Sequence, residues 1–285
     1  MHNDDEIIDR LAFDELGLPK EMRILIADVI SDEFWMPKLA AMMSVLNAFD
    51  KGAAEEIDIE DPTNKKLQGI VRFCVPLFEI YREIDGIEPD PSWLAAMHLW
   101  VQVWRPLDNL LDSNESKTAN LREYNISLLR AWTFHASAFP ESRLFNEFLA
   151  CLNDTLDAET NEETRRDPSL IYQRVRLYEL IFNDLPTLSE ATRETYRRYI
   201  NSIGIAHDFG DVSNDIKDEN TTAVTELFRA IDPHCRVTAS HFSALRSKAR
   251  EVFDTQRRRI DGDALKSCWV TQRNIKAFFT WAFQN

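Results

Sequence analysis

Apolar residues recur at steps of three and four positions along most of this chain. Between positions 62 and 84 they form one such series, made of Leu67, Ile70, Val71, Cys74, Leu77, Phe78 and Tyr81. This spacing places them on one stripe of an α-helix. Only seven of the 285 residues are glycine, which disfavours hairpin-rich β folds and leaves no Gly-rich loop for binding phosphate. The pattern therefore predicts an all-α protein.

Further helical segments follow, separated by short polar or proline-containing stretches. We expect them at residues 20–35, 38–50, 91–112, 117–138, 141–159, 168–184, 187–218, 222–231, 237–261 and 263–284. The loops are too short to be domain linkers, so we predict a single domain over residues 1–285, an all-α bundle of about ten helices. Helices with apolar residues on more than one face favour a bundle around a central cavity.

The charge balance restricts the partners of this chain. Asp and Glu outnumber Lys and Arg by 48 to 33, a net charge of −15. Phosphate-rich partners would be repelled, which argues against nucleic acid and against a polybasic membrane contact, whereas divalent cations are compatible. We also expect no stable membrane insertion, because no apolar run is long enough to span a bilayer. The four cysteines lie far apart, which indicates free thiols. With an acidic N-terminal sequence and no apolar run of ~20 residues, we expect a cytoplasmic protein.

The first acidic motif closes the helix expected at 91–112. Asp108 and Asp112 are four residues apart and so project from one helical face. Two anions in a last helical turn oppose the helix dipole, and bound Mg²⁺ would reverse that effect. Chance is a real alternative, since this composition predicts roughly eight such acid pairs at random, most of them on solvated faces.

The second acidic motif lies in the helix expected at 187–218 and the residues after it. Asp211, Asp215 and Glu219 form a row at i, i+4 and i+8, and Asn214 and Asp218 form a neighbouring row. The preceding turns are apolar, so these carboxylates have to reach water, cations or a metal.

Each motif resembles the aspartate-rich motif of class I isoprenoid synthases, and the chain is most similar to bacterial class I terpene synthases. DNLLD at 108–112 and NDIKD at 214–218 each look like DDxxD with one Asp replaced by Asn. The second segment also resembles the family's NSE/DTE motif, in one of two registers: Asp211, Asp215 and Glu219, or Asn214, Asp218 and Thr222. The resemblance implies that the motifs hold about three Mg²⁺ ions against the diphosphate of an allylic isoprenyl substrate.

Other segments of the chain are also similar to that family. Arg176, four residues after Tyr172, is similar to the Arg that contacts the substrate diphosphate, and Arg174 is the competing choice. Lys217, Arg273 and Asn274 are further candidates for binding diphosphate, although the family's terminal Arg-Tyr pair is absent. The resemblance also implies aromatic walls around a carbocation, for which the chain offers Phe73, Phe78, Trp100, Trp104, Phe134, Trp269 and Phe278.

We therefore predict a lyase that ionises and cyclises an allylic diphosphate to a terpene and releases diphosphate. No Arg-Arg-Gly follows the first motif, which favours cyclisation over a short-chain prenyl diphosphate synthase as the alternative. A non-catalytic, acidic helical interaction protein is a second alternative. A helical diphosphohydrolase is a third, but the chain lacks paired ExxE(D) helices. A homodimer is left open as the assembly.

Overall fold

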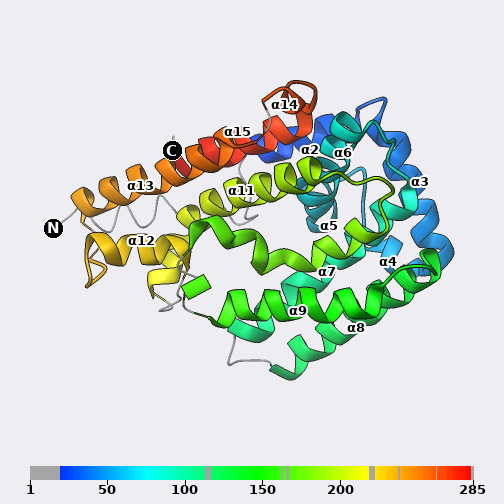
Figure 1. Ribbon diagram of the computed structural model, residues 1–285, viewed down its shortest axis with the longest axis horizontal. Coiled ribbons are helices and arrows are strands. Elements are labelled where there is room, and N and C mark those ends of the chain that lie inside the picture. Colours follow the sequence, from blue (N-terminus) through cyan, green and yellow to red (C-terminus); the bar gives the residue numbers. More distant parts are fainter. Residues whose placement is uncertain are drawn as a thin grey trace. The chain divides into compact units, whose positions relative to one another are not determined.

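The computed structural model describes residues 20–112, 117–161, 163–164, 167–217, 222–236, 238–260 and 262–283 (Figure 1). Within these ranges the regular elements are all helical, and 11 helices have seven or more residues. The prediction of an all-α fold is confirmed. Among the described residues, no helix combines the length and the apolar character that crossing a bilayer requires.

The helices largely follow the expected segments, and those at 91–112 and 117–138 begin and end at the expected residues. In chain order they are α2 (Lys20–Ile30), α3 (Trp35–Phe49), α4 (Lys51–Glu55), α5 (Lys65–Gly69), the π-helix η1 (Ile70–Cys74), α6 (Val75–Asp85), α7 (Pro91–Asp112), α8 (Lys117–Ala138), α9 (Leu144–Thr160), the 3₁₀ segment η2 (Pro168–Asn183), α11 (Glu190–Lys217), α12 (Ala223–Ile231), α13 (Ala239–Arg258), α14 (Ala264–Ser267) and α15 (Trp269–Phe283).

Three of the differences from the expected helices have a clear local reason. Asp32 accepts hydrogen bonds from the N–H groups of Phe34 and Trp35, both at 2.9 Å, which ends the first helix early and starts α3. Pro76 has no N–H to donate, and the wider π turn of η1 immediately precedes it. Cys268 leaves the helical region (φ −84°, ψ 72°) and separates α14 from α15.

The chain packs into two compact units that alternate along the sequence. Unit 1 takes its described residues from Met1–Arg23, Leu156–Arg174 and Glu194–Asn285, and unit 2 from Ile24–Thr155 and Val175–Arg193. Each unit is described by itself below. The single domain over residues 1–285 and its central cavity stay predictions.

The core of unit 2 contains a polar network as well as apolar side chains. The indole Nε1–H of Trp100 on α7 donates to Nδ1 of His135 on α8 at 2.9 Å. Nε2 of His135 lies 2.5 Å from Oδ2 of Asp184, and the hydroxyl of Ser142 lies 3.2 Å from both. Trp100 and His135 are fully buried. Because an indole can only donate, Nδ1 of His135 must accept, and the imidazole proton is on Nε2.

In unit 1, α11, α13 and α15 lie near one another (Figure 1). They pack through aromatic side chains. Phe209 of α11 stacks on Phe283 of α15 at 5.1 Å between ring centroids and contacts Phe242 of α13 at 5.4 Å. Next to this stack, the backbone of Gly210 lies against Trp281. A Cβ at position 210 would be 1.8 Å from Cη2 of that indole. The absence of a side chain at Gly210 is what lets α15 approach α11 so closely.

We therefore expect Gly210→Ala to destabilise the protein by about 1–3 kcal/mol, because the helices or the indole must move. Gly69→Ala is the matched control: its backbone is helical and its new Cβ would meet Val101 at an ordinary 3.5 Å. There the higher helix propensity of alanine predicts a neutral change or a gain of about 0.5–1 kcal/mol. Urea unfolding of both variants measures the difference, and equal effects would contradict the close contact.

Candidate functional site

Three carboxylates follow one face of α11 in unit 1. Asp208, Asp211 and Asp215 are separated by three and four residues on a continuous helix, so they project from the same side. Asp208 and Asp215 are buried, with 7% and 8% of their surface exposed, and Asp211 is half-buried. Asp211 and Asp215 belong to the predicted second motif, and the structure adds Asp208 to their row.

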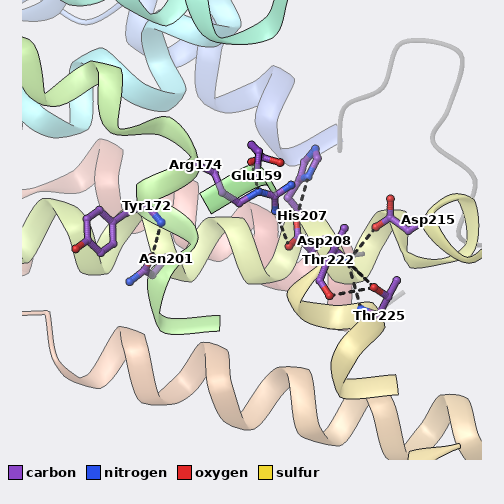
Figure 2. Close-up of polar contacts among 9 residues, drawn as sticks. All are labelled: Glu159, Tyr172, Arg174, Asn201, His207, Asp208, Asp215, Thr222 and Thr225. Carbon is purple, nitrogen blue, oxygen red and sulfur yellow. Dashed lines mark hydrogen bonds and ion pairs between the residues drawn. The ribbon is translucent and has the colours of Figure 1, made fainter. Parts of the chain in front are cut away.

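A single guanidinium joins this row to two other elements (Figure 2). Nε of Arg174, on η2, donates to Glu159 at 2.6 Å, and its Nη1 donates to Asp208 at 3.2 Å. Glu159 lies in the last turn of α9 and is 5% exposed. His207 lies next to the pair, with Nδ1 3.9 Å from Oδ1 of Asp208. Two buried carboxylates from different helices thus fix the plane of the Arg174 side chain.

Two residues of α11 hold the first half of η2 in place. The side-chain oxygen of Asn201 accepts from the N–H of Tyr172 at 2.8 Å, and its amide nitrogen donates to the carbonyl of Ser169 at 2.5 Å (Figure 2). One turn later, Gly204 leaves room for Ile171, whose Cγ2 would be 2.4 Å from a Cβ at that position. These contacts bring η2 against α11 at the level where Arg174 reaches Asp208.

A kink separates the two arginines that the sequence proposes as diphosphate contacts. Val175 has non-helical angles (φ −122°, ψ 22°), and the boundary between the units crosses the chain at this point. Arg174 lies in unit 1 with the second motif. Arg176 lies in unit 2, where it forms ion pairs with Asp154 and Glu179. The structure therefore brings Arg174, and not Arg176, to Asp208.

Thr222 connects the second motif to the next helix. Its hydroxyl caps α12 by accepting from the N–H of Thr225 at 3.2 Å, and it donates to Oδ2 of Asp215 at 3.3 Å (Figure 2). The N–H of Thr222 in turn donates to the Thr225 hydroxyl at 2.7 Å. Thr222 has extended backbone angles (φ −118°, ψ 165°) as the N-cap of α12, so it is not itself a helical residue of the register Asn214, Asp218 and Thr222. Asp218 and Glu219 lie outside the described residues, as do the side chains of Asn214 and Lys217.

The first motif lies in unit 2, at the C-terminal end of α7. Asp108 is half-buried and close enough to Tyr178 to act on it electrostatically. Burial is the main cause of a strongly raised pKa of Tyr178; the charge of Arg72 lowers it, and Cys74 and Asp108 raise it further. The ring of Phe73, from the π-helical turn, lies 5.2 Å from that of Tyr178. Asp112 is the last residue of α7, and its side chain lies outside the described part of the chain.

The candidate residues of α15 have different environments within unit 1. Arg273 is half-buried, with its guanidinium 5.6 Å from the ring centroid of Trp269. Asn274 is fully buried. A role for either residue in binding diphosphate stays a prediction.

A crevice too narrow to hold a water molecule lies beside Arg174 in unit 1. It is lined by Thr164, Asp167, Leu170, Ile171, Arg174, Thr222 and Ala223. Two of these lining residues also contact the acidic row of α11: Arg174 contacts Asp208, and Thr222 contacts Asp215.

In the described ranges, no three His, Cys, Asp or Glu side chains come together as a metal site. Of the register Asp211, Asp215 and Glu219, the first two residues are described, and they lie one turn apart on the same face of α11. Their donors are carboxylate oxygens, and the Thr222 hydroxyl that contacts Asp215 is also an oxygen donor. This donor chemistry fits Mg²⁺, which prefers oxygen ligands.

Sequence reasoning missed Glu159, Asp208, Asn201 and Gly204. Asp208 could have been found, because it precedes Asp211 by three residues and Asp215 by seven and so shares their face. Glu159 carries no such signal, since its partner is on another helix. Comparison with known proteins finds no family model, no curated protein and no solved structure that matches this chain.

Proposed function

We propose that this chain is a Mg²⁺-dependent enzyme of the class I terpene synthase type, which ionises an allylic isoprenyl diphosphate and releases diphosphate. The observation that carries the proposal is the position of Arg174 beside the carboxylate row of α11. A diphosphate group can be bound by an arginine together with Mg²⁺ held on carboxylates, and this part of the chain offers both Arg174 and suitable carboxylates.

Asp211 and Asp215 would hold Mg²⁺ from α11, and Asp108 and Asp112 are the corresponding candidates on α7. Bound there, Mg²⁺ would neutralise negative charge on the departing diphosphate. Arg174 would orient the diphosphate through its planar N–H donors, because Glu159 and Asp208 already hold the guanidinium in one plane. Thr222 would keep the Asp215 carboxylate in position through its hydroxyl.

The direct test is incubation with C10, C15 and C20 allylic diphosphates and Mg²⁺, with released diphosphate and volatile products as the readout. We expect turnover of at least one substrate and products that contain no added isoprene unit. A longer prenyl diphosphate, formed when isopentenyl diphosphate is added, would instead identify a prenyl diphosphate synthase.

We expect Asp211→Asn to lower turnover on the order of 100-fold or more, because it removes a carboxylate that would hold Mg²⁺ next to the leaving diphosphate. Asp157→Asn, an equivalent change at an exposed position of α9, should leave turnover unchanged. Mg²⁺ with inorganic diphosphate should also stabilise the wild type by about 2.7 kcal/mol at a hundredfold excess over the dissociation constant. No turnover and no stabilisation of the wild type would exclude the proposal and favour an interaction protein.

A further inference from the structure

Positive charge is concentrated at one end of this acidic chain. Residues 236–285 contain ten Lys and Arg against four Asp and Glu, a net charge of +6. The preceding 235 residues contain 23 and 44, a net charge of −21. The basic residues of this segment therefore lie mainly on α13, α14, α15 and the turns between them, all in unit 1.

Two packed helices display this charge together with aromatic rings. Phe253 of α13 contacts Phe279 of α15 at 5.5 Å between centroids, and the guanidinium of Arg250 lies 5.2 Å from the Phe279 centroid. Arg257 is seven residues after Arg250, so it projects from the same side of α13. Both arginines are exposed.

On α15, basic residues again lie next to an aromatic ring. Trp269, Arg273 and Lys276 are spaced by four and three residues and so follow one face of the helix. Trp269, Arg273 and Phe279 are half-buried, and Lys276 is exposed. The six residues Arg250, Arg257, Trp269, Arg273, Lys276 and Phe279 are called the basic–aromatic face below.

Acidic residues within the segment offset little of this charge. Asp254 is the carboxylate near both Arg250 and Arg257, at distances of 4.0 and 3.9 Å, the outer limit of an ion pair. Exposed ion pairs of this kind contribute about 1 kcal/mol or less to stability. Asp254 therefore competes only weakly with another anion for Arg250 and Arg257.

We propose that the basic–aromatic face docks reversibly on an anionic lipid surface. Guanidinium and ammonium groups bind lipid phosphates, and amphipathic tryptophan rings favour the level of the headgroups. The net charge of −15 does not prevent this contact, because salt screens charges beyond about 8 Å and the local positive charge faces the lipid. The proposal is independent of the proposed function and involves no insertion of a helix.

The same geometry disfavours single-stranded nucleic acid as the occupant. Nucleic acids bind such surfaces by stacking bases on exposed aromatic faces. Here Arg273 lies over the ring of Trp269 and Arg250 lies over that of Phe279. These ring faces are covered by the protein's own cations, which leaves less room for a base to stack.

The test is co-sedimentation of the full chain with phosphatidylcholine vesicles, with and without phosphatidylglycerol, at low and high salt. We expect binding only to the anionic vesicles and its loss at high salt. The triple variant Arg250→Gln, Arg257→Gln and Lys276→Gln should weaken binding on the order of 100-fold, at about 1 kcal/mol for each basic group. The matched control neutralises three exposed lysines of unit 2, Lys51→Gln, Lys65→Gln and Lys117→Gln, and should bind like the wild type.

Unchanged melting temperatures show that both triple variants remain folded, which exposed substitutions should allow. The proposal is overturned if the wild type does not bind anionic vesicles, if it binds neutral vesicles equally well, or if the two triple variants lose binding equally. Tighter binding to a single-stranded RNA oligonucleotide than to the vesicles would assign the face to nucleic acid instead.

Discussion

Replacing Arg174 by glutamine should destabilise the protein by about 3–5 kcal/mol, because it removes the cation shared by two buried carboxylates. The side chains of Glu159 and Asp208 are only 3% and 9% exposed. Water cannot take over the role of the guanidinium there without opening the packing between α9, η2 and α11. The free energy of unfolding in urea measures the effect.

Arg176→Gln is the matched control, two residues along the same segment. One of its partners, Asp154, is 37% exposed, so water solvates that carboxylate when the arginine is removed. Glu179, the other partner, is 10% exposed and lies 3.4 Å away, so we expect a cost of about 1–2 kcal/mol, still below that of Arg174→Gln. Equal costs for the two variants would show that the ion pairs of Arg174 contribute no more than those at the surface.

A compensated variant separates charge burial from packing. Adding Glu159→Gln and Asp208→Asn to the Arg174→Gln chain removes the buried negative charges and should restore most of the lost stability. If the triple variant is as unstable as Arg174→Gln alone, the arginine contributes through the packing of its aliphatic carbons.

Local patterns in the sequence predict the helices well, because each depends on apolar spacing within about 20 residues. Contacts between segments that are distant in the sequence leave no comparable pattern in it. Tyr172 and Arg176 suggest one helical segment, yet Val175 breaks it and sends the neighbouring arginine to Asp208. The first half of this segment is held by Asn201 and Gly204, about 30 residues later, and no local rule identifies those contacts.

Trp100, in the core of unit 2, also makes contacts that local sequence patterns do not predict. Its position in an apolar helix makes it one candidate for an aromatic wall around a carbocation, with ordinary core packing as the alternative. Neither interpretation predicts that its indole N–H donates to His135, or that His135 contacts Asp184. The three residues are separated by 35 and 49 positions, so only the fold reveals them as a network.

Removing the imidazole of His135 should therefore be costly. In His135→Leu, the indole N–H of Trp100 loses its acceptor, and Asp184, 6% exposed, keeps only the Ser142 hydroxyl among the contacts of this network. Each buried polar group left without its partner costs about 1–3 kcal/mol, which predicts a loss of roughly 2–6 kcal/mol. Thermal and urea unfolding should show this loss.

His135→Gln tests the assigned tautomer, because glutamine can reproduce both hydrogen bonds. Its amide oxygen can accept from Trp100 while its amide nitrogen donates to Asp184, as Nδ1 and Nε2–H of the histidine do. We expect this variant to keep at least half of the stability that His135→Leu loses. If glutamine is no better than leucine, the imidazole contributes mainly through its ring contacts with Trp100 and Phe139, at 6.0 and 5.1 Å. A double-mutant cycle with Trp100→Phe decides the matter, since coupling through the hydrogen bond should be strong with histidine or glutamine at position 135 and absent with leucine.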